Sequence, residues 1–171
     1  MPLRVGTFQA GANLASTAWD RSFKFVFEVD PLLAEVNKTW PGRPSVPVQR
    51  GGSLERCGKQ FLADHPVDIL IVDHSRDSSL ARSTQPVWEE WLESCPEEDR
   101  PSLIIQTWRL MSMLADEGPM SKHARKRASI LGYTSRCSFV NNLQCGGSVQ
   151  QDRLVVCNFR NSAVPKSIVE G

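Results

Sequence analysis

The sequence predicts an α/β fold: a doubly wound, mostly parallel sheet with helices on both faces. Short apolar runs rich in β-branched residues alternate along its 171 residues with segments of helical periodicity. One of these runs, Val67 to Val72, is apolar except at Asp68, which is typical of a strand buried on both faces. The polar stretch Asp73 to Asp77 follows it directly, where open α/β sheets gather their ligands.

Composition limits the kind of protein this chain can be. With 171 residues, 40% of them hydrophobic, it is long enough for one domain with a core, and we expect a single domain over residues 1–171. The net charge of +1 predicts no strong overall attraction to nucleic acid or membrane, although a local basic patch stays open. No apolar run approaches the roughly 18 residues that span a bilayer, and the first residues lack the apolar core of a signal peptide, so no membrane partner is expected.

The five cysteines indicate the compartment. They are odd in number, widely spaced and without a Cys-x-x-Cys pair: Cys57, Cys95, Cys137, Cys145 and Cys157. This pattern favours reduced thiols in a cytoplasmic or nuclear protein, and it predicts no metal site.

The N-terminal segment has the order strand, turn, helix. Leu3 to Phe8 is an apolar strand candidate, Gln9 to Asn13 is a run of small residues around Gly11, and Leu14 to Trp19 can start a helix. Such a turn lets backbone N–H groups approach a cofactor. It holds one glycine, so an ordinary connection between strand and helix is the alternative.

A second strand, with Phe25 to Val29 at its centre, ends in acidic residues. Glu28 lies 17 residues after Gly11, close to the spacing at which a strand-end carboxylate accepts hydrogen bonds from the ribose of a nucleotide cofactor. The alternative is a solvated acid at the end of a strand. Pro31 can open a helix whose apolar face includes Leu32, Leu33, Val36 and Trp40.

The middle of the chain alternates in the same way. Residues 40–52 hold three prolines and three glycines and predict a loop, whereas residues 54–63 predict a short helix before the central strand. Residues 87–94 predict a helix with Trp88, Trp91 and Leu92 on one face, packed in the core.

The last third begins with a strand over Ser102 to Trp108 and a basic helix over Lys122 to Leu131, with Gly132 as its C-cap. Two short apolar runs, Ser138 to Leu143 and Leu154 to Asn158, are expected to pair as late strands. The basic helix can contact phosphates through Arg125, Lys126 and Arg127; a solvated helix face is the alternative.

Six segments, in the same order, resemble the cytosine-5 DNA methyltransferases. LRVGTFQAG is similar to the first strand and cofactor turn of that family, and FVFEVDPLLAEVNKTWPG to its ribose-binding strand and following helix. HPVDILIVDHSRD stands where the family has its proline-cysteine loop, and RPSLIIQTW where it has its Glu-Asn-Val strand. LGYTSRCSFVNNLQCGGSVQQDRLVV is similar to the Gln-x-Arg-x-Arg segment, and NSAVPKS to the closing motif.

The resemblance implies a Rossmann-like methyltransferase sheet and S-adenosylmethionine as cofactor. The residues that it places at the cofactor are Phe8, Gly11, Glu28, Val29 and Asp73. It also implies that Arg153 contacts nucleic acid, in addition to the residues of the basic helix. The family's other arginine in that segment is Gln151 here, and Ser53 stands where an acid would hold the adenine amine.

The catalytic residues of the family are replaced. Arg76 takes the place of the cysteine that adds to the base, and an arginine cannot act as a nucleophile because its guanidinium stays protonated. Gln106 takes the place of the glutamate that protonates the base, and an amide has no proton to exchange at neutral pH. Arg153 and Val164 are 11 residues apart, which leaves no room for the family's target-recognition domain. We therefore expect no methylation at carbon 5 of cytosine.

Three hypotheses follow from these departures. The first is a degenerate methyltransferase-like domain that retains S-adenosylmethionine or nucleic-acid binding, with DNA, RNA or another protein as partner. The second is an active methyltransferase with altered chemistry or substrate, in which Asp73, His74 or Asp77 serves as acid or base. The third is a truncated gene product without function.

Overall fold

The computed structural model describes residues 1–8, 22–30, 33–39, 46–51, 60–73, 90–109, 122–141 and 152–163. The chain forms two compact units, Met1–Pro101 and Ser102–Gly171. Four described strands lie in the first unit and three in the second.

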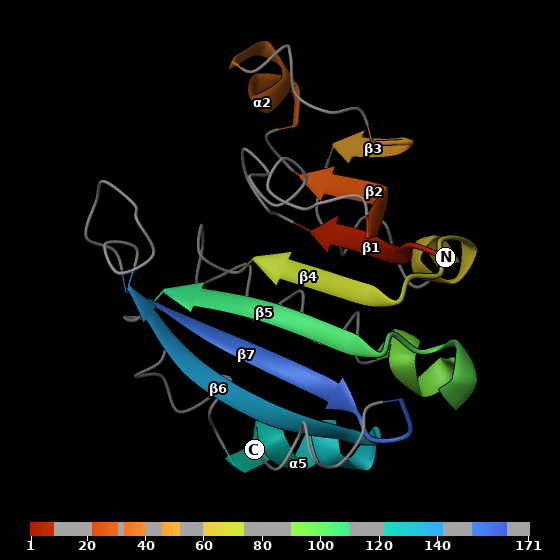
Figure 1. Ribbon diagram of the computed structural model, residues 1–171, viewed down its shortest axis with the longest axis vertical. Coiled ribbons are helices and arrows are strands. Elements are labelled where there is room, and N and C mark those ends of the chain that lie inside the picture. The colour runs from red at the N-terminus through yellow and green to blue at the C-terminus, as the bar shows by residue number, and fades with distance from the viewer. Residues whose placement is uncertain are drawn as a thin grey trace. The chain divides into compact units, whose positions relative to one another are not determined.

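The first unit is built on parallel strands in the order β3-β2-β1-β4. Their bounds are Leu3–Phe8 for β1, Phe23–Asp30 for β2, Val48–Gly51 for β3 and Ile69–Asp73 for β4. The three parallel strands that the sequence predicts in this region are confirmed, and β4 begins two residues later than the apolar run. All four arrowheads point the same way in Figure 1, so the carboxyl ends share one edge.

The prediction of a loop over residues 40–52 is wrong for its last part. Val48–Gly51 forms β3, which pairs with β2 in register from Phe27 opposite Val48 to Asp30 opposite Gly51. Prolines and glycines weaken the local preference for a strand, but the edge of β2 offers backbone hydrogen bonds that local sequence does not reveal.

An aromatic cluster fills one face of this unit. The ring of Phe27 lies 5.2 Å from that of Phe8 and 5.2 Å from that of Phe61, which belongs to a helical turn over residues 60–64. The register of β1 on β2 shifts between Val5 and Gly6, and Gly6 lies directly against the Phe27 ring. Of the helix predicted over residues 54–63, the described residues 60–63 are helical.

Short helices complete the described part of this unit. Helix α2 covers Leu33–Thr39, with Leu33 buried, and a 3-10 turn, η1, covers Glu97–Asp99. Residues 90–94 are helical and bury Trp91 and Leu92, which confirms the predicted core role of these two side chains. Trp88 lies outside the described residues.

An ion pair joins Asp68, the residue before β4, to Arg4 on β1. Arg4 Nη2 lies 3.0 Å from Asp68 Oδ1, the Arg4 backbone N–H donates to Asp68 Oδ2 at 2.7 Å, and the Asp68 N–H donates to the Arg4 carbonyl at 2.9 Å. The side-chain hydrogen bond to Asp68 raises the pKa of the Arg4 guanidinium above its ordinary value. This contact fixes the amino ends of two neighbouring strands.

The second unit is antiparallel, with the strand order β5-β7-β6. Strand β5 covers Leu103–Arg109, β6 covers Tyr133–Asn141 and β7 covers Asp152–Arg160. The predicted pairing of two late strands is confirmed, and both strands are longer than the apolar runs that predicted them. The side chain of Asn158 on β7 links both neighbouring strands. Its Oδ1 accepts a hydrogen bond from Ser135 Oγ on β6 at 2.7 Å, and its Nδ2 donates to the Ile104 carbonyl on β5 at 3.5 Å.

Helix α5, Lys122–Ile130, packs against β6. Gly132 follows it with φ +83°, a left-handed conformation, and its N–H donates to the Ser129 carbonyl at 3.0 Å. The predicted C-cap is therefore confirmed.

The predicted α/β class with a mostly parallel sheet is confirmed. The described ladders within the first unit are parallel, and the β5–β7 and β7–β6 ladders of the second unit are antiparallel. The helices in the described ranges are few and short. None of them is long and apolar enough to cross a membrane. A single domain over residues 1–171 stays a prediction.

Candidate functional site

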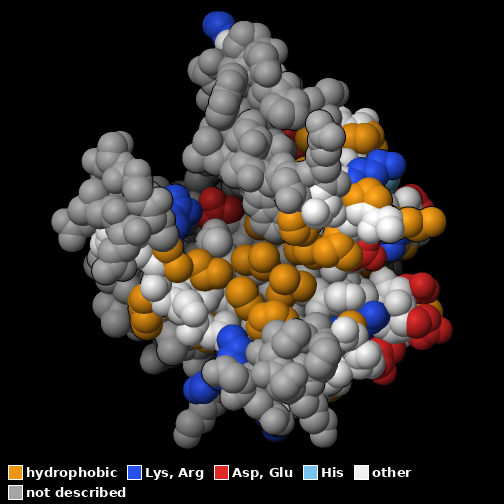
Figure 2. All heavy atoms as spheres, viewed as in Figure 1, with side chains coloured by type: hydrophobic (Ala, Val, Ile, Leu, Met, Phe, Trp, Pro, Cys, Tyr) orange, Lys and Arg blue, Asp and Glu red, His pale blue; other side chains and the backbone are white. Residues whose placement is uncertain are grey.

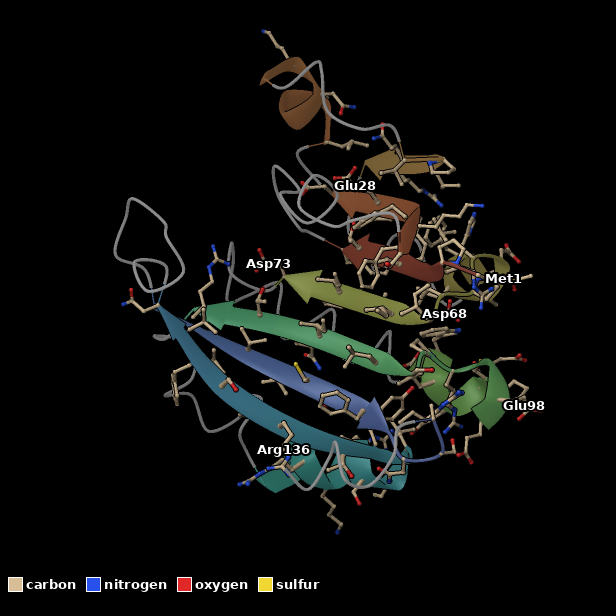
Figure 3. The ribbon with its side chains drawn as sticks, viewed as in Figure 1. Met1, Glu28, Asp68, Asp73, Glu98 and Arg136 are labelled. Carbon is tan, nitrogen blue, oxygen red and sulfur yellow. The ribbon has the colours of Figure 1, made fainter. Side chains whose placement is uncertain are left out.

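Four of the residues predicted to bind a cofactor meet at the carboxyl ends of β1, β2 and β4. Phe8 lies opposite Val29 on one side and Val72 on the other, and Asp73 ends β4. Glu28 lies one position before Val29, and Figure 3 shows Glu28 and Asp73 near the arrowheads of their strands. Parallel strands in register therefore gather these residues at one edge of the first unit.

Four other predicted residues lie outside the described ranges. They are Gly11 of the turn after β1 and the loop residues His74, Arg76 and Asp77 after β4. Their roles stay predictions.

Glu28 is fully buried, with 0% of its surface exposed. The alternative prediction of a solvated strand-end acid is therefore wrong. Its Oε2 accepts a hydrogen bond from Gln49 Nε2 at 3.4 Å, and Gln49 is its direct partner on β3. Asp30, two residues further along β2, is also fully buried. Two buried acids at the end of one strand are unusual because removing a carboxylate from water is costly unless polar groups surround it.

A polar row crosses three strands at this edge. Thr7 on β1 lies opposite Glu28 on β2, which lies opposite Gln49 on β3. Thr7 is fully buried, and its Oγ1 has no hydrogen-bond partner in the described structure. A buried hydroxyl without a partner costs free energy.

Sequence reasoning missed Thr7, Asp30 and Gln49 as members of this site. Thr7 lies within a short apolar strand, and Gln49 lies in a segment predicted to be a loop. Only the register of β1 and β3 on β2 places them beside Glu28. The two acids at the end of the Phe-rich strand were the one available signal for Asp30.

Phe8 and Val29 contribute differently from the polar residues. Both side chains are fully buried, and the Phe8 ring packs 5.2 Å from Phe27 and 6.4 Å from Phe61. Because both side chains pack in the core, only the backbone groups of Phe8 and Val29 can contact a ligand. Asp73 is half-buried.

The remaining predicted residues lie in the second unit. Gln106, 4% exposed, lies on β5 opposite Val156, and Arg153 lies on β7 opposite Arg109. On α5, Arg125 and Lys126 are exposed and Arg127 is half-buried. The carboxamide at position 106 is thus in the core of its unit.

The described cysteines, Cys95, Cys137 and Cys157, are not in disulfide bonds. Burial raises the pKa of Cys137, against a smaller opposite effect of the nearby Arg125 charge. Burial also raises the pKa of Cys157, and the nearby Cys137 adds to it. In the described ranges, no three His, Cys, Asp or Glu side chains gather as a metal ion would require.

No family model matches the sequence, and no curated protein is similar to it. Solved structures are similar in fold. The S. pombe Dnmt2 methyltransferase has a TM-score of 0.72 at 12% identity, covering 93% of this chain and 49% of that one. The Entamoeba histolytica methyltransferase EhMeth has a TM-score of 0.62 at 11% identity, covering 96% and 54%.

A shorter neighbour is the methyltransferase domain of bacterial CtHen1, with a TM-score of 0.57 at 18% identity, covering 91% of this chain and 89% of that one. The fold is therefore that of the methyltransferases. Dnmt2 and a prophage-encoded DNA modification methyltransferase of E. coli are among the neighbours, which agrees with the cytosine-5 resemblance of the sequence. The chain spans about half the length of the structures first matched.

Proposed function

We propose that this chain is a methyltransferase-fold domain that binds S-adenosylmethionine at the carboxyl ends of β1 and β2 and does not methylate carbon 5 of cytosine. The observation that supports binding is the buried carboxylate of Glu28, with Gln49 as its hydrogen-bond donor, at the edge where such sheets bind nucleotides. A buried acid with polar neighbours fits ribose hydroxyls, which can donate to it.

Each residue has a separate role in this proposal. Glu28 accepts hydrogen bonds from the ribose, and Gln49 holds its carboxylate in place. Phe8 and Val29 line the edge through their backbone. When bound, the cofactor supplies an electrophilic methyl group.

The absence of cytosine-5 chemistry follows from the residues at two positions. Carbon 5 becomes nucleophilic only after a thiolate adds to the neighbouring ring position, and the chain has Arg76 where that thiol is needed. Gln106 cannot donate the proton that the base requires.

A second candidate function is methyl transfer to nitrogen or oxygen. It is supported by Asp73, a half-buried carboxylate at the end of β4 that can act as a base. Such atoms attack the methyl group directly, so no cysteine is needed.

Calorimetry with S-adenosylmethionine tests the cofactor site. The wild-type protein should bind, and Glu28→Gln should weaken binding roughly 10- to 100-fold, because a hydrogen bond to a charged acceptor contributes about 1.5–3 kcal/mol. Glu90→Gln, an exposed acid in the same unit, is the matched control and should bind as the wild type does. Equal affinity in wild type and Glu28→Gln, or no binding by folded protein, would refute the site. Labelled cofactor offered with DNA, RNA and protein then separates the two functions.

A further inference from the structure

The two units carry opposite charge. The unit Met1–Pro101 contains 11 Lys and Arg against 15 Asp and Glu, a net charge of −4. The unit Ser102–Gly171 contains nine Lys and Arg against four Asp and Glu, a net charge of +5. The near-neutral total therefore conceals a basic unit, and such asymmetry between parts of a chain is typical of proteins that contact polyanions.

Helix α5 concentrates this charge on one side. Its nine residues, KHARKRASI, include four Lys or Arg and no acid. Ala128 is buried toward the unit, whereas Arg125 and Lys126 are exposed. Because α5 packs against β6, its cations lie beside that strand. Figure 2 shows blue side chains at the lower border of the view, where Figure 1 places α5 and β6.

Arg125 lies near the middle of β6. Its charge lowers the pKa of the Cys137 thiol, against the larger opposite effect of burial, so its guanidinium is near the Cys137 side chain. Phe139 is two residues further along the strand and faces the same side of the sheet as Cys137, whereas the exposed Arg136 faces the other side.

An aromatic side chain lies further along β6. Nine helical residues span about 14 Å, but nine strand residues span about 30 Å, and α5 returns into β6 through a two-residue connection. The strand therefore extends beyond the helix that packs on it. Phe139 lies in this extension and is 61% exposed, although its strand partner Leu154 is fully buried.

We propose that Arg125, Lys126 and Phe139 form a binding surface for single-stranded nucleic acid. The two cations contact phosphates, and the Phe139 ring stacks on a base. Charge complementarity selects a polyanion. The exposed ring selects a single strand over a duplex, because only an unpaired base presents its face to a side chain. All three residues belong to Ser102–Gly171, so the surface does not depend on the cofactor site in the other unit.

Fluorescence anisotropy with labelled oligouridine and oligothymidine of about 12 nucleotides tests this surface, since one such surface engages about 4–16 nucleotides. Phe139→Ala should weaken binding about 5- to 100-fold, the usual effect of removing the stacking on one base. Replacing Arg125 and Lys126 together by Gln should weaken binding and lower the dependence of log affinity on log salt by roughly 1.4, about 0.7 for each phosphate that is no longer neutralised.

Two controls match these variants. Ile130→Ala removes another exposed apolar side chain from the same unit, and Lys24→Gln removes an exposed cation from the other unit. Both should bind as the wild type does, and circular dichroism should show that every variant is folded. Unchanged binding by Phe139→Ala, duplex binding at least as tight as single-strand binding, or no binding at about 50 mM salt would each overturn the proposal.

Discussion

Gly6 is where the parallel sheet leaves no space for a side chain. A Cβ at this position would lie 2.2, 2.4 and 2.8 Å from three atoms of the Phe27 ring. Gly6→Ala should therefore lower the free energy of unfolding by about 1–3 kcal/mol, the usual cost of overpacking a core. Urea denaturation measures the change.

Gly51→Ala is the control for that substitution. Gly51 ends β3, and a Cβ there would meet nothing within 4 Å. Its stability should stay within about 0.5 kcal/mol of the wild type. Equal stability of Gly6→Ala and wild type would show that the Phe27 ring moves aside without cost.

The hydroxyl of Thr7 is a second residue-scale feature. It is buried without a hydrogen-bond partner in the described structure, so replacing it by a methyl group removes a desolvation cost. Thr7→Val should raise the free energy of unfolding by about 1 kcal/mol. Thermal unfolding with and without S-adenosylmethionine measures both this gain and any loss of cofactor stabilisation.

Thr134→Val provides the opposite case. Thr134 Oγ1 donates to Asn161 Oδ1 at 2.7 Å, so the same substitution there should destabilise by about 0.5–1.5 kcal/mol. If Thr7→Val were also destabilising, the Thr7 hydroxyl would have to have a partner in the folded protein.

At the scale of elements, the end of α5 depends on one backbone conformation. Gly132 has φ +83°, and a Cβ there would meet nothing within 4 Å, so the cost of a side chain is conformational rather than steric. Gly132→Ala should destabilise by about 1–2 kcal/mol. Gly132→Asn should cost less, because asparagine tolerates the left-handed region. Chemical denaturation of both variants measures the difference, and equal losses would contradict this explanation.

Strand pairing is the other decisive feature at this scale. Glu28 obtains its donor because β3 pairs with β2 in a register that sets Gln49 opposite it. A shift by one residue would turn Gln49 to the other face of the sheet. The candidate cofactor site therefore depends on a four-residue strand at the end of the β3-β2-β1-β4 order.

At the scale of the whole molecule, the proposed function predicts the absence of one reaction. DNA incubated with the protein and S-adenosylmethionine should contain no 5-methylcytosine above a heat-inactivated control, measured by mass spectrometry of nucleosides. The reason is that the family resemblance puts Arg76 and Gln106 in place of the nucleophile and its acid partner, and loss of one member of a catalytic set already costs orders of magnitude in rate.

Restoring single residues should not restore the reaction. Arg76→Cys alone still has Gln106 in place of the acid. The double variant with Gln106→Glu is expected to lack the family's target-recognition segment, which would have to hold a flipped base whose extrusion costs a few kcal/mol. Formation of 5-methylcytosine by the wild-type protein would overturn the proposed function. Its formation by the double variant would show that no further recognition segment is needed.

Local patterns determined much of the fold. Strands β1 and β4 were predictable from their apolar runs, since a strand buried on both faces needs apolar residues at successive positions, and β2 was predictable from its alternating pattern. Gly132 was predictable as a helix end because glycine occupies the left-handed region readily. Glu28 was predictable as a candidate from its spacing after Gly11 and its place at the end of a strand.

Tertiary structure alone decided the rest. Pairing between segments distant in sequence produces strand β3, the Thr7–Glu28–Gln49 row and the hydrogen bonds of Asn158 to both neighbouring strands. Local composition does not encode this pairing. The exposure of Phe139 opposite the buried Leu154 likewise belongs to the folded unit and is not apparent in the local sequence. The sequence by itself determined which elements form and which chemical groups the chain possesses. The register and lengths of paired elements decided which groups meet, because hydrogen bonds between strands are formed only when the whole unit folds.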